Sequence, residues 1–132
     1  MKKFIASILF VVSVPVLAGK TYYCGNPPVT LTGMLANRHA IDIQFGEEVP
    51  VTYPALILSE PINLTGEGEC EGMRKDVGTI QLGMSEHKDF DLYDKNIGNL
   101  AKVTCDLYAS HTAHHFTPIV CSVEKLEIIK KQ

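Results

Sequence analysis

The sequence predicts a mainly β protein, an OB-fold-like five-stranded barrel with one helix between strands 3 and 4. Three observations support this fold class. Several segments alternate apolar and polar residues, one later segment has helical periodicity, and two long apolar segments end the chain as a hairpin. The resulting order, β-β-β-α-β-β, is that of a five-stranded Greek-key barrel. A small β-sandwich with an incidental helix is the alternative.

Three strands are predicted before the helix. They cover residues 29–35 (VTLTGML), 51–58 (VTYPALIL) and 78–84 (GTIQLGM). Pro54 lies inside the second of them, which favours an edge position or a bulge because proline cannot donate a hydrogen bond to a ladder. The segment 63–76 (NLTGEGECEGMRKD) is rich in glycine and charge, and it is predicted to be a loop.

The predicted helix follows the third strand. Ser85 can cap its first turn, and Phe90, Tyr93 and Ile97 fall on one face at helical spacing. This face is therefore expected to pack on the barrel.

The predicted hairpin consists of strands 100–110 and 115–128. If Cys105 faces Cys121, one face of the ribbon becomes almost wholly apolar, whereas a slip by one residue would scramble the two faces. In this register Val103 faces Val123, Leu107 faces Ile119, and Asp106 and Ser122 go to the other face.

The four cysteines, Cys24, Cys70, Cys105 and Cys121, are even in number and follow an export signal, so disulfides are expected. No C-x-x-C pair is present, and such tight pairs are typical of structural zinc sites. Four cysteines allow three connectivities. The hairpin register favours Cys24–Cys70 and Cys105–Cys121.

Residues 1–18 are predicted to be a cleavable secretory signal peptide. A short basic start with Lys2 and Lys3 precedes the uncharged residues 4–17, and Ala18 supplies a small residue at the cleavage site. The apolar run is shorter than the roughly 20 residues of a membrane-spanning helix, so no membrane insertion is expected after cleavage. We therefore expect a periplasmic protein whose residues 19–132 form a single OB-like domain.

The charge balance bears on the class of partner. The chain has 12 Lys and Arg against 15 Asp and Glu, and loss of Lys2 and Lys3 changes the formal net charge from −3 to −5. An acidic domain has no electrostatic attraction for DNA, RNA or anionic lipid. We therefore expect a protein partner and no nucleic acid; the oligomeric state is left open.

Three histidines gather in the segment SHTAHHFTP. The hairpin register places His111 opposite His115 across the turn 112–114, close enough for two imidazoles to share a Zn²⁺ or Cu²⁺ ion. His114 could approach from the turn and His39 from the connection between the first two strands. A hydrogen-bonded structural network and a ligand or partner surface are the alternatives to a metal site.

Three segments carry a resemblance to a known family: VTLTGMLANR, ALILSEPI, and the stretch from IGNLAKV through ASHTAHHFTPIV. They resemble a bacterial family of small exported proteins of unknown function, with a T-G-x-L strand and an H-T-x-H-H-x-T-P hairpin. A third histidine usually follows the H-H pair in that family, whereas this chain has Phe116 there. The resemblance implies an exported, one-domain, OB-like protein and brings no established activity.

The favoured function is a periplasmic, non-enzymatic binding module, most specifically an inhibitor or immunity-type protein that blocks an enzyme attacking the cell envelope. The sequence holds neither a G-x-S-x-G elbow nor an H-E-x-x-H motif, and segments 37–50, 63–76 and 110–116 are expected to project as loops. The alternative is a transition-metal-binding protein that uses His111, His114 and His115, with no cofactor otherwise expected. Candidate partner-binding residues are His39, Glu47, Glu48, His111, His114, His115 and Phe116.

Overall fold

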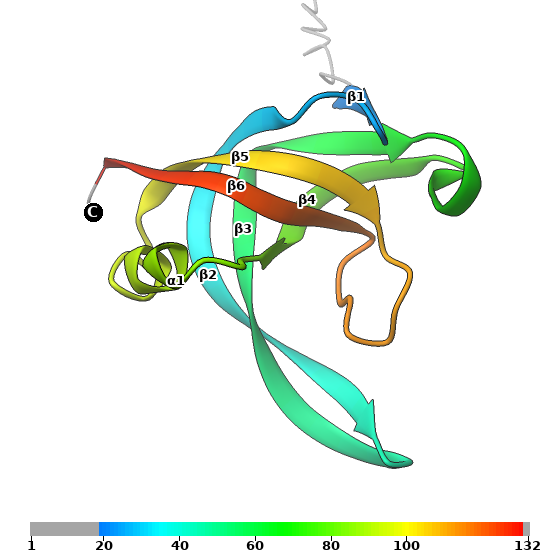
Figure 1. Ribbon diagram of the computed structural model, residues 1–132, viewed down its shortest axis with the longest axis horizontal. Helices are drawn as coiled ribbons and strands as arrows, with labels where there is room; N and C mark the ends of the chain where they lie inside the picture. The colour runs from blue at the N-terminus through cyan, green and yellow to red at the C-terminus, as the bar shows by residue number, and fades with distance from the viewer. Residues whose placement is uncertain (1–18, 131–132) are drawn as a thin grey trace, which may run out of the picture.

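The structure, a computed structural model, describes residues 19–130; the predicted signal peptide lies outside these residues. Five strands form a closed barrel because they pair in the order β3-β2-β5-β6-β4 and β4 also pairs with β3 (Figure 1). The helix α1 follows the third barrel strand, so the predicted OB-like fold is confirmed. The elements are β1 (Lys20–Tyr23), β2 (Val29–Gln44), β3 (Glu47–Thr65), the 3-10 helix η1 (Gly68–Cys70), β4 (Arg74–Gly83), α1 (His87–Asp94), β5 (Leu100–Ala109) and β6 (Ile119–Lys130).

The strand β1 was not predicted. Its four residues pair in parallel with residues 62–65 of β3, outside the closed barrel. A strand this short shows too little alternation to be recognised in the sequence. Within residues 19–130, no helix is long and apolar enough to cross a bilayer.

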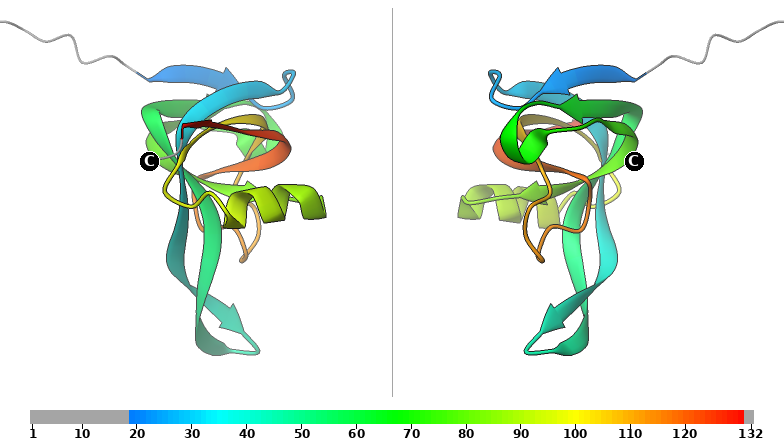
Figure 2. Two further views of the ribbon diagram at one scale, coloured as in Figure 1. Left: turned by 90° about the vertical axis from the view of Figure 1, so that its left-hand side faces the viewer. Right: turned by 90° about the vertical axis from the view of Figure 1, so that its right-hand side faces the viewer.

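β2 and β3 are longer than predicted, and they continue beyond the barrel as a two-stranded ribbon, here called the arm (residues 37–54). The strands pair without a shift from Gly33 opposite Leu58 to Gln44 opposite Glu47. The predicted loop 37–50 is therefore wrong. The segment stays extended because the two strands pair with each other along its whole length. Both views of Figure 2, each turned by 90° from that of Figure 1, show that the arm projects far from the barrel wall.

A two-residue turn, Phe45-Gly46, closes the arm. Both residues have positive φ, 51° and 78°. Positive φ at both central positions is what a type I′ hairpin turn requires, because this turn matches the twist of the flanking strands. Gly46 adopts such a φ at little cost, whereas Phe45 does not.

The other predicted loop, 63–76, is partly wrong as well. β3 extends to Thr65 and β4 begins at Arg74, with η1 between them. Pro54 lies where β3 pairs with β2 only, since the pairing with β4 begins at Ala55, and this agrees with the edge position expected of a proline.

The barrel core is built from fully buried aliphatic residues of all five strands. Helix α1 covers part of it, and of the predicted apolar face only Tyr93 is buried. Asp89 and Tyr93 are buried, whereas Phe90 and Ile97 are 41% and 47% exposed. The N-cap is Glu86 instead of Ser85. The core includes Leu35, Leu56, Leu64, Ile80, Val103, Ile119 and both sulfurs of the β5–β6 bridge.

Both predicted disulfides form, Cys24–Cys70 and Cys105–Cys121. The predicted hairpin register is wrong by two residues, because Leu107 and not Cys105 faces Cys121. A shift by an even number keeps each side chain on its face, so the apolar face survives. The Cys105–Cys121 bridge is diagonal, with Cα atoms 5.0 Å apart, and a bulge lies beside it between Thr104 and Cys105.

The predicted tight turn is also wrong. The last pair of the ladder is Ala109 opposite Ile119, and residues 110–118 form a loop, here called the 110–118 loop. Pro118 has no N–H to donate, and the Thr117 hydroxyl donates to the carbonyl of Ile119 (2.6 Å). His111 and His115 are therefore loop residues and not a strand pair.

Candidate functional site

The candidate site is the region where the 110–118 loop meets the arm. The rings of Phe116 and Tyr53 pack together with centroids 5.2 Å apart. Nδ1 of His114 lies 3.3 Å from Oδ2 of Asp42. In OB-folds the loop between the first two barrel strands and the loop between the last two flank the binding face. Several candidate residues predicted from the sequence lie on the arm and on the 110–118 loop.

The tip of the arm is apolar and exposed. Ile41 and Ile43 are 57% and 56% exposed, and Phe45 is fully exposed. Glu47 and Glu48 beside them are also exposed, so the tip combines apolar surface with two carboxylates. Folding alone gives no reason to hold three large apolar side chains in water, since their burial elsewhere would stabilise the protein.

Asp42 lies among these residues but on the opposite face of the ribbon, and it is only 3% exposed. Gln44 donates to its Oδ2 (3.1 Å), and this hydrogen bond, helped by the charge of His114 and opposed by burial, lowers the pKa of Asp42 below its usual value. Its other oxygen, Oδ1, is buried and has no hydrogen-bond donor within the described residues.

Each of the three loop histidines holds its Nδ1 in a different contact. Because a carbonyl only accepts, Nδ1 of His111 donates to the carbonyl of Ala109 (3.0 Å). Nδ1 of His115 accepts the backbone N–H of His111 (3.1 Å), which fixes His115 as the Nε2–H tautomer when neutral. His114 faces Asp42 instead. The histidines thus form part of a hydrogen-bonded loop structure.

The surroundings of His115 disfavour its protonated form. Burial, and then the charges of His111 and His114, lower its pKa below the usual value. The rings of His111 and His115 meet edge to face with centroids 4.7 Å apart, and the ring of Tyr108 lies 5.3 Å from that of His115. Protonation of His115 at Nδ1 would break its bond with the His111 amide.

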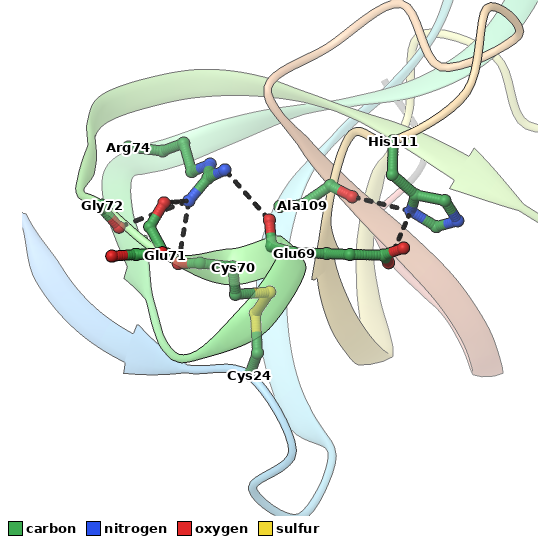
Figure 3. The surroundings of a disulfide bond; sticks show 8 residues. All are labelled: Cys24, Glu69, Cys70, Glu71, Gly72, Arg74, Ala109 and His111. Atoms are coloured by element: carbon green, nitrogen blue, oxygen red, sulfur yellow. Dashed lines mark hydrogen bonds and ion pairs between the residues drawn. A yellow bond between two sulfur atoms is a disulfide. The ribbon is translucent and has the colours of Figure 1, made fainter.

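A second contact connects the loop to the disulfide region (Figure 3). Nδ1 of His111 lies 3.6 Å from a carboxylate oxygen of Glu69 in η1, next to the Cys24–Cys70 bridge. The guanidinium of Arg74 donates to four carbonyls of this segment, those of Glu69, Cys70, Glu71 and Gly72. η1 is thus a fixed support for His111, the first histidine of the loop.

Gln81 of β4 anchors the other side of the loop. Its Oε1 accepts the N–H of Phe116 (2.7 Å) and its Nε2 donates to the carbonyl of His114 (3.0 Å). The N–H of Gln81 donates to the hydroxyl of Thr117 (2.9 Å). These bonds explain why the hairpin does not close as a tight turn, since residues 114–117 bond to β4 and not to β5.

The structure brings together only some of the predicted site residues. His111, His114, His115 and Phe116 share the loop, whereas Glu47 and Glu48 lie at the tip of the arm. His39 does not join the other histidines: it is exposed and, three residues from Asp42, lies on the opposite face of the ribbon. Four residues of the site were not predicted from the sequence: Phe45, Asp42, Tyr53 and Gln81. The alternation in AIDIQF was the available signal for the first two.

The metal-binding hypothesis for His111, His114 and His115 stays a prediction. Between residues 19 and 130, no group of three or more His, Cys, Asp or Glu side chains is arranged to hold a metal ion. Titration of the wild type, His111→Ala and His115→Ala with Zn²⁺ and Cu²⁺ tests it. Two clefts, of about 350 and 400 Å³, lie beside β1 and away from the candidate site.

Comparisons with known proteins give one domain match and one match to a solved structure. Residues 79–127 match a domain of unknown function (DUF4431). Among solved structures, a Plasmodium falciparum SSB complex with ssDNA matches at 18% identity and a TM-score of 0.34, over 79% of this chain and 93% of that one. No curated protein matches the chain significantly.

Proposed function

We propose that this chain is a periplasmic, non-enzymatic binding module for another protein, with the arm tip and the 110–118 loop as its binding face. More specifically, we propose that it is an inhibitor or immunity-type protein that blocks an enzyme attacking the cell envelope. Such a role needs a projecting element that enters a cleft and a rigid scaffold that holds it, because rigidity reduces the entropy lost on docking.

Phe45 is the observation that carries the proposal. It is fully exposed and lies in the left-handed region at φ 51°. A bulky residue in this region costs roughly 1–2 kcal/mol, and the exposed ring adds no burial to offset the cost. A residue that is unfavourable for folding on both counts is a candidate for a binding role. Aromatic anchors are typical of the centre of protein interfaces.

The surroundings of Phe45 support a protein partner. Ile41 and Ile43 extend the apolar surface, and Glu47 and Glu48 add negative charge at its edge. We expect the partner to offer an apolar pocket with basic groups at its rim, since complementary charge speeds association and excludes wrong partners.

The test compares three immobilised proteins in a periplasmic extract of the organism that encodes the chain: the wild type, Phe45→Asn and Tyr23→Asn. Tyr23 is 57% exposed on β1, at the end of the molecule opposite the arm (Figure 1), and it serves as the matched control. The proposal expects a protein retained by the wild type and the control but not by Phe45→Asn. That protein should degrade purified cell wall more slowly when the wild type is added.

Three results would contradict the proposal. The first is that no protein is retained at micromolar concentration, and the second is that Phe45→Asn retains the same proteins as the wild type. The third is that a labelled oligodeoxythymidine binds the wild type at physiological salt, which would indicate a single-stranded nucleic acid as ligand.

A further inference from the structure

The two edges of the arm differ in their capacity to pair with another strand. β2 pairs with β5 through residues 29–34 only, and no strand among residues 19–130 pairs with the outer edge of β2 in the arm. An unpaired edge offers free N–H and C=O groups to another chain, and natural proteins normally block such edges.

The hydrogen bonds at the root of the arm show which residues face outward. The N–H of Leu35 donates to the carbonyl of Asn99 (3.0 Å), and the N–H of Gly98 donates to the carbonyl of Leu35 (2.7 Å). Leu35 therefore directs its backbone away from β3. Because this direction alternates along a strand, every second residue after Leu35 does the same. These residues are Asn37, His39, Ile41 and Ile43.

The edge of β3 in the arm is blocked. Pro50 pairs with Ile41 and Pro54 pairs with Asn37, so both prolines occupy outward-facing positions. A proline there has no N–H to offer, which is how edge strands are protected from pairing. The β2 edge, by contrast, carries no proline, and its exposed Ile41 and Ile43 add apolar surface.

We propose that two copies of this chain pair through the β2 edges of their arms, in antiparallel orientation. The two arms then form a four-stranded ribbon in the order β3, β2, β2 of the second copy, β3 of the second copy. The arrangement is a two-fold symmetric interface in which each copy offers the same segment. This inference goes beyond the proposed function and does not depend on it.

Side-chain charges select the register. Only registers that place outward-facing residues opposite each other can form ladder bonds. With Ala40 at the two-fold axis, Arg38 lies opposite Asp42 of the second copy, and the symmetric pair repeats this contact. Each such pair stabilises a sheet, and Arg38 comes beside the carboxylate whose Oδ1 lacks a donor.

The neighbouring registers are less favourable. A shift toward the tip that centres the axis on Asp42 sets two like charges opposite each other. Centring on Ile41 or His39 leaves Arg38 and Asp42 opposite uncharged residues. In the Ala40-centred register four outward-facing pairs exchange about eight backbone hydrogen bonds.

The experiment uses the exported chain with both native disulfides. Ala40→Cys places two thiols at the axis, where a non-hydrogen-bonded pair has Cα atoms about 4.5 Å apart, within reach of a disulfide. Thr52→Cys is the matched control, because Thr52 is exposed and faces outward on the blocked β3 edge. We expect mild oxidation to give a covalent dimer of Ala40→Cys only, with peptide mapping showing both native bridges intact.

Sedimentation of the oxidised wild type should show a concentration-dependent dimer. Arg38→Asp places a carboxylate opposite that of Asp42 of the second copy, and it should raise the dimer Kd at least tenfold. Ile41→Pro removes an outward N–H while sparing the β2–β3 ladder and should give a monomer with unchanged far-UV circular dichroism. A wild type that stays monomeric at 100 micromolar, or equal cross-linking by Ala40→Cys and Thr52→Cys, would overturn the proposal. Either result leaves the capture test with Phe45→Asn unaffected.

Discussion

Phe45 is the residue at which stability and binding are expected to conflict. We predict that Phe45→Asn raises the free energy of unfolding by about 1 kcal/mol, because asparagine tolerates the left-handed region and loses no buried contact. Urea unfolding of both proteins measures the change. A lower stability of the variant would show that the exposed ring contributes to the fold.

Tyr93 is the residue that connects α1 to the root of the arm. Its hydroxyl donates to the carbonyl of Ala36 (2.7 Å) in a buried position, and this burial raises the pKa of Tyr93. Removing one partner of a buried hydrogen bond costs about 1–3 kcal/mol, so Tyr93→Phe should destabilise the protein by that amount. Thermal and urea unfolding check it, with Tyr23→Phe at an exposed position as the control that should change little.

At the scale of elements, the 110–118 loop is expected to respond to pH through His115. Its folded pKa lies below the unfolded value of about 6.5, so the folded protein binds fewer protons in the window between the two. This contribution to stability is therefore complete above about pH 6.5 and is lost as the pH falls through the folded pKa. The groups that face His115 are His111, His114 and Tyr108.

The variant that tests this prediction is His115→Asn. Its Oδ1 can still accept the His111 N–H, but its side chain does not titrate. We expect it to show a smaller loss of stability between pH 7.5 and pH 5 than the wild type. His39 lies on the face of the arm opposite to Asp42, so His39→Asn should keep the wild-type dependence of stability on pH. If His115→Asn also keeps it, His115 is not the titrating group.

The anchoring of the same loop by β4 gives a separate prediction. Gln81→Met removes the side-chain bonds to Phe116 and His114 at nearly constant volume. Amide hydrogen exchange at Phe116 should become at least tenfold faster, because its N–H loses its acceptor. Thr79→Val on the same strand is the control, and unchanged exchange in Gln81→Met would show that other contacts hold the loop.

The sequence predicted the elements whose pattern is local and missed those set by distant contacts. Alternating apolar residues located the starts of β2 and β5, and the cysteine spacing with an apolar hairpin face gave both disulfides. The two-residue error in the hairpin register arose because the bridged cysteines were placed directly opposite each other, whereas Cys105 faces Val123 and Cys121 faces Leu107. The loop conformation depends on Gln81, 33 residues before His114, and no local rule connects them.

Only part of the candidate site was predicted from the sequence. The histidine segment stood out by composition, whereas Phe45 became notable only when its exposure and φ were known. The face of α1 shows the same limit. Tyr93 is buried as its apolar spacing predicted, but the buried face continues through Asp89, while Phe90 and Ile97 are exposed.

For the whole molecule, burial predicts the order in which the two disulfides react. Cys105 and Cys121 are fully buried in the core, whereas Cys24 is half-buried beside η1. A reductant under native conditions should therefore reach Cys24–Cys70 first, since thiol exchange needs access to a sulfur. Alkylation and peptide mapping over time should label Cys24 and Cys70 before the other pair; the reverse order would contradict the burial argument.

The continuity of β2 and β3 between barrel and arm has a mechanical consequence. At about 3.3 Å per residue, the eight residues from Asn37 to Gln44 give the tip a reach of about 26 Å. The same strands carry Leu35 and Leu56, which are fully buried in the barrel. The tip is therefore connected to the core by two continuous strands that are fixed at their barrel end. A torque applied at the turn is therefore carried into the barrel instead of being absorbed by a hinge.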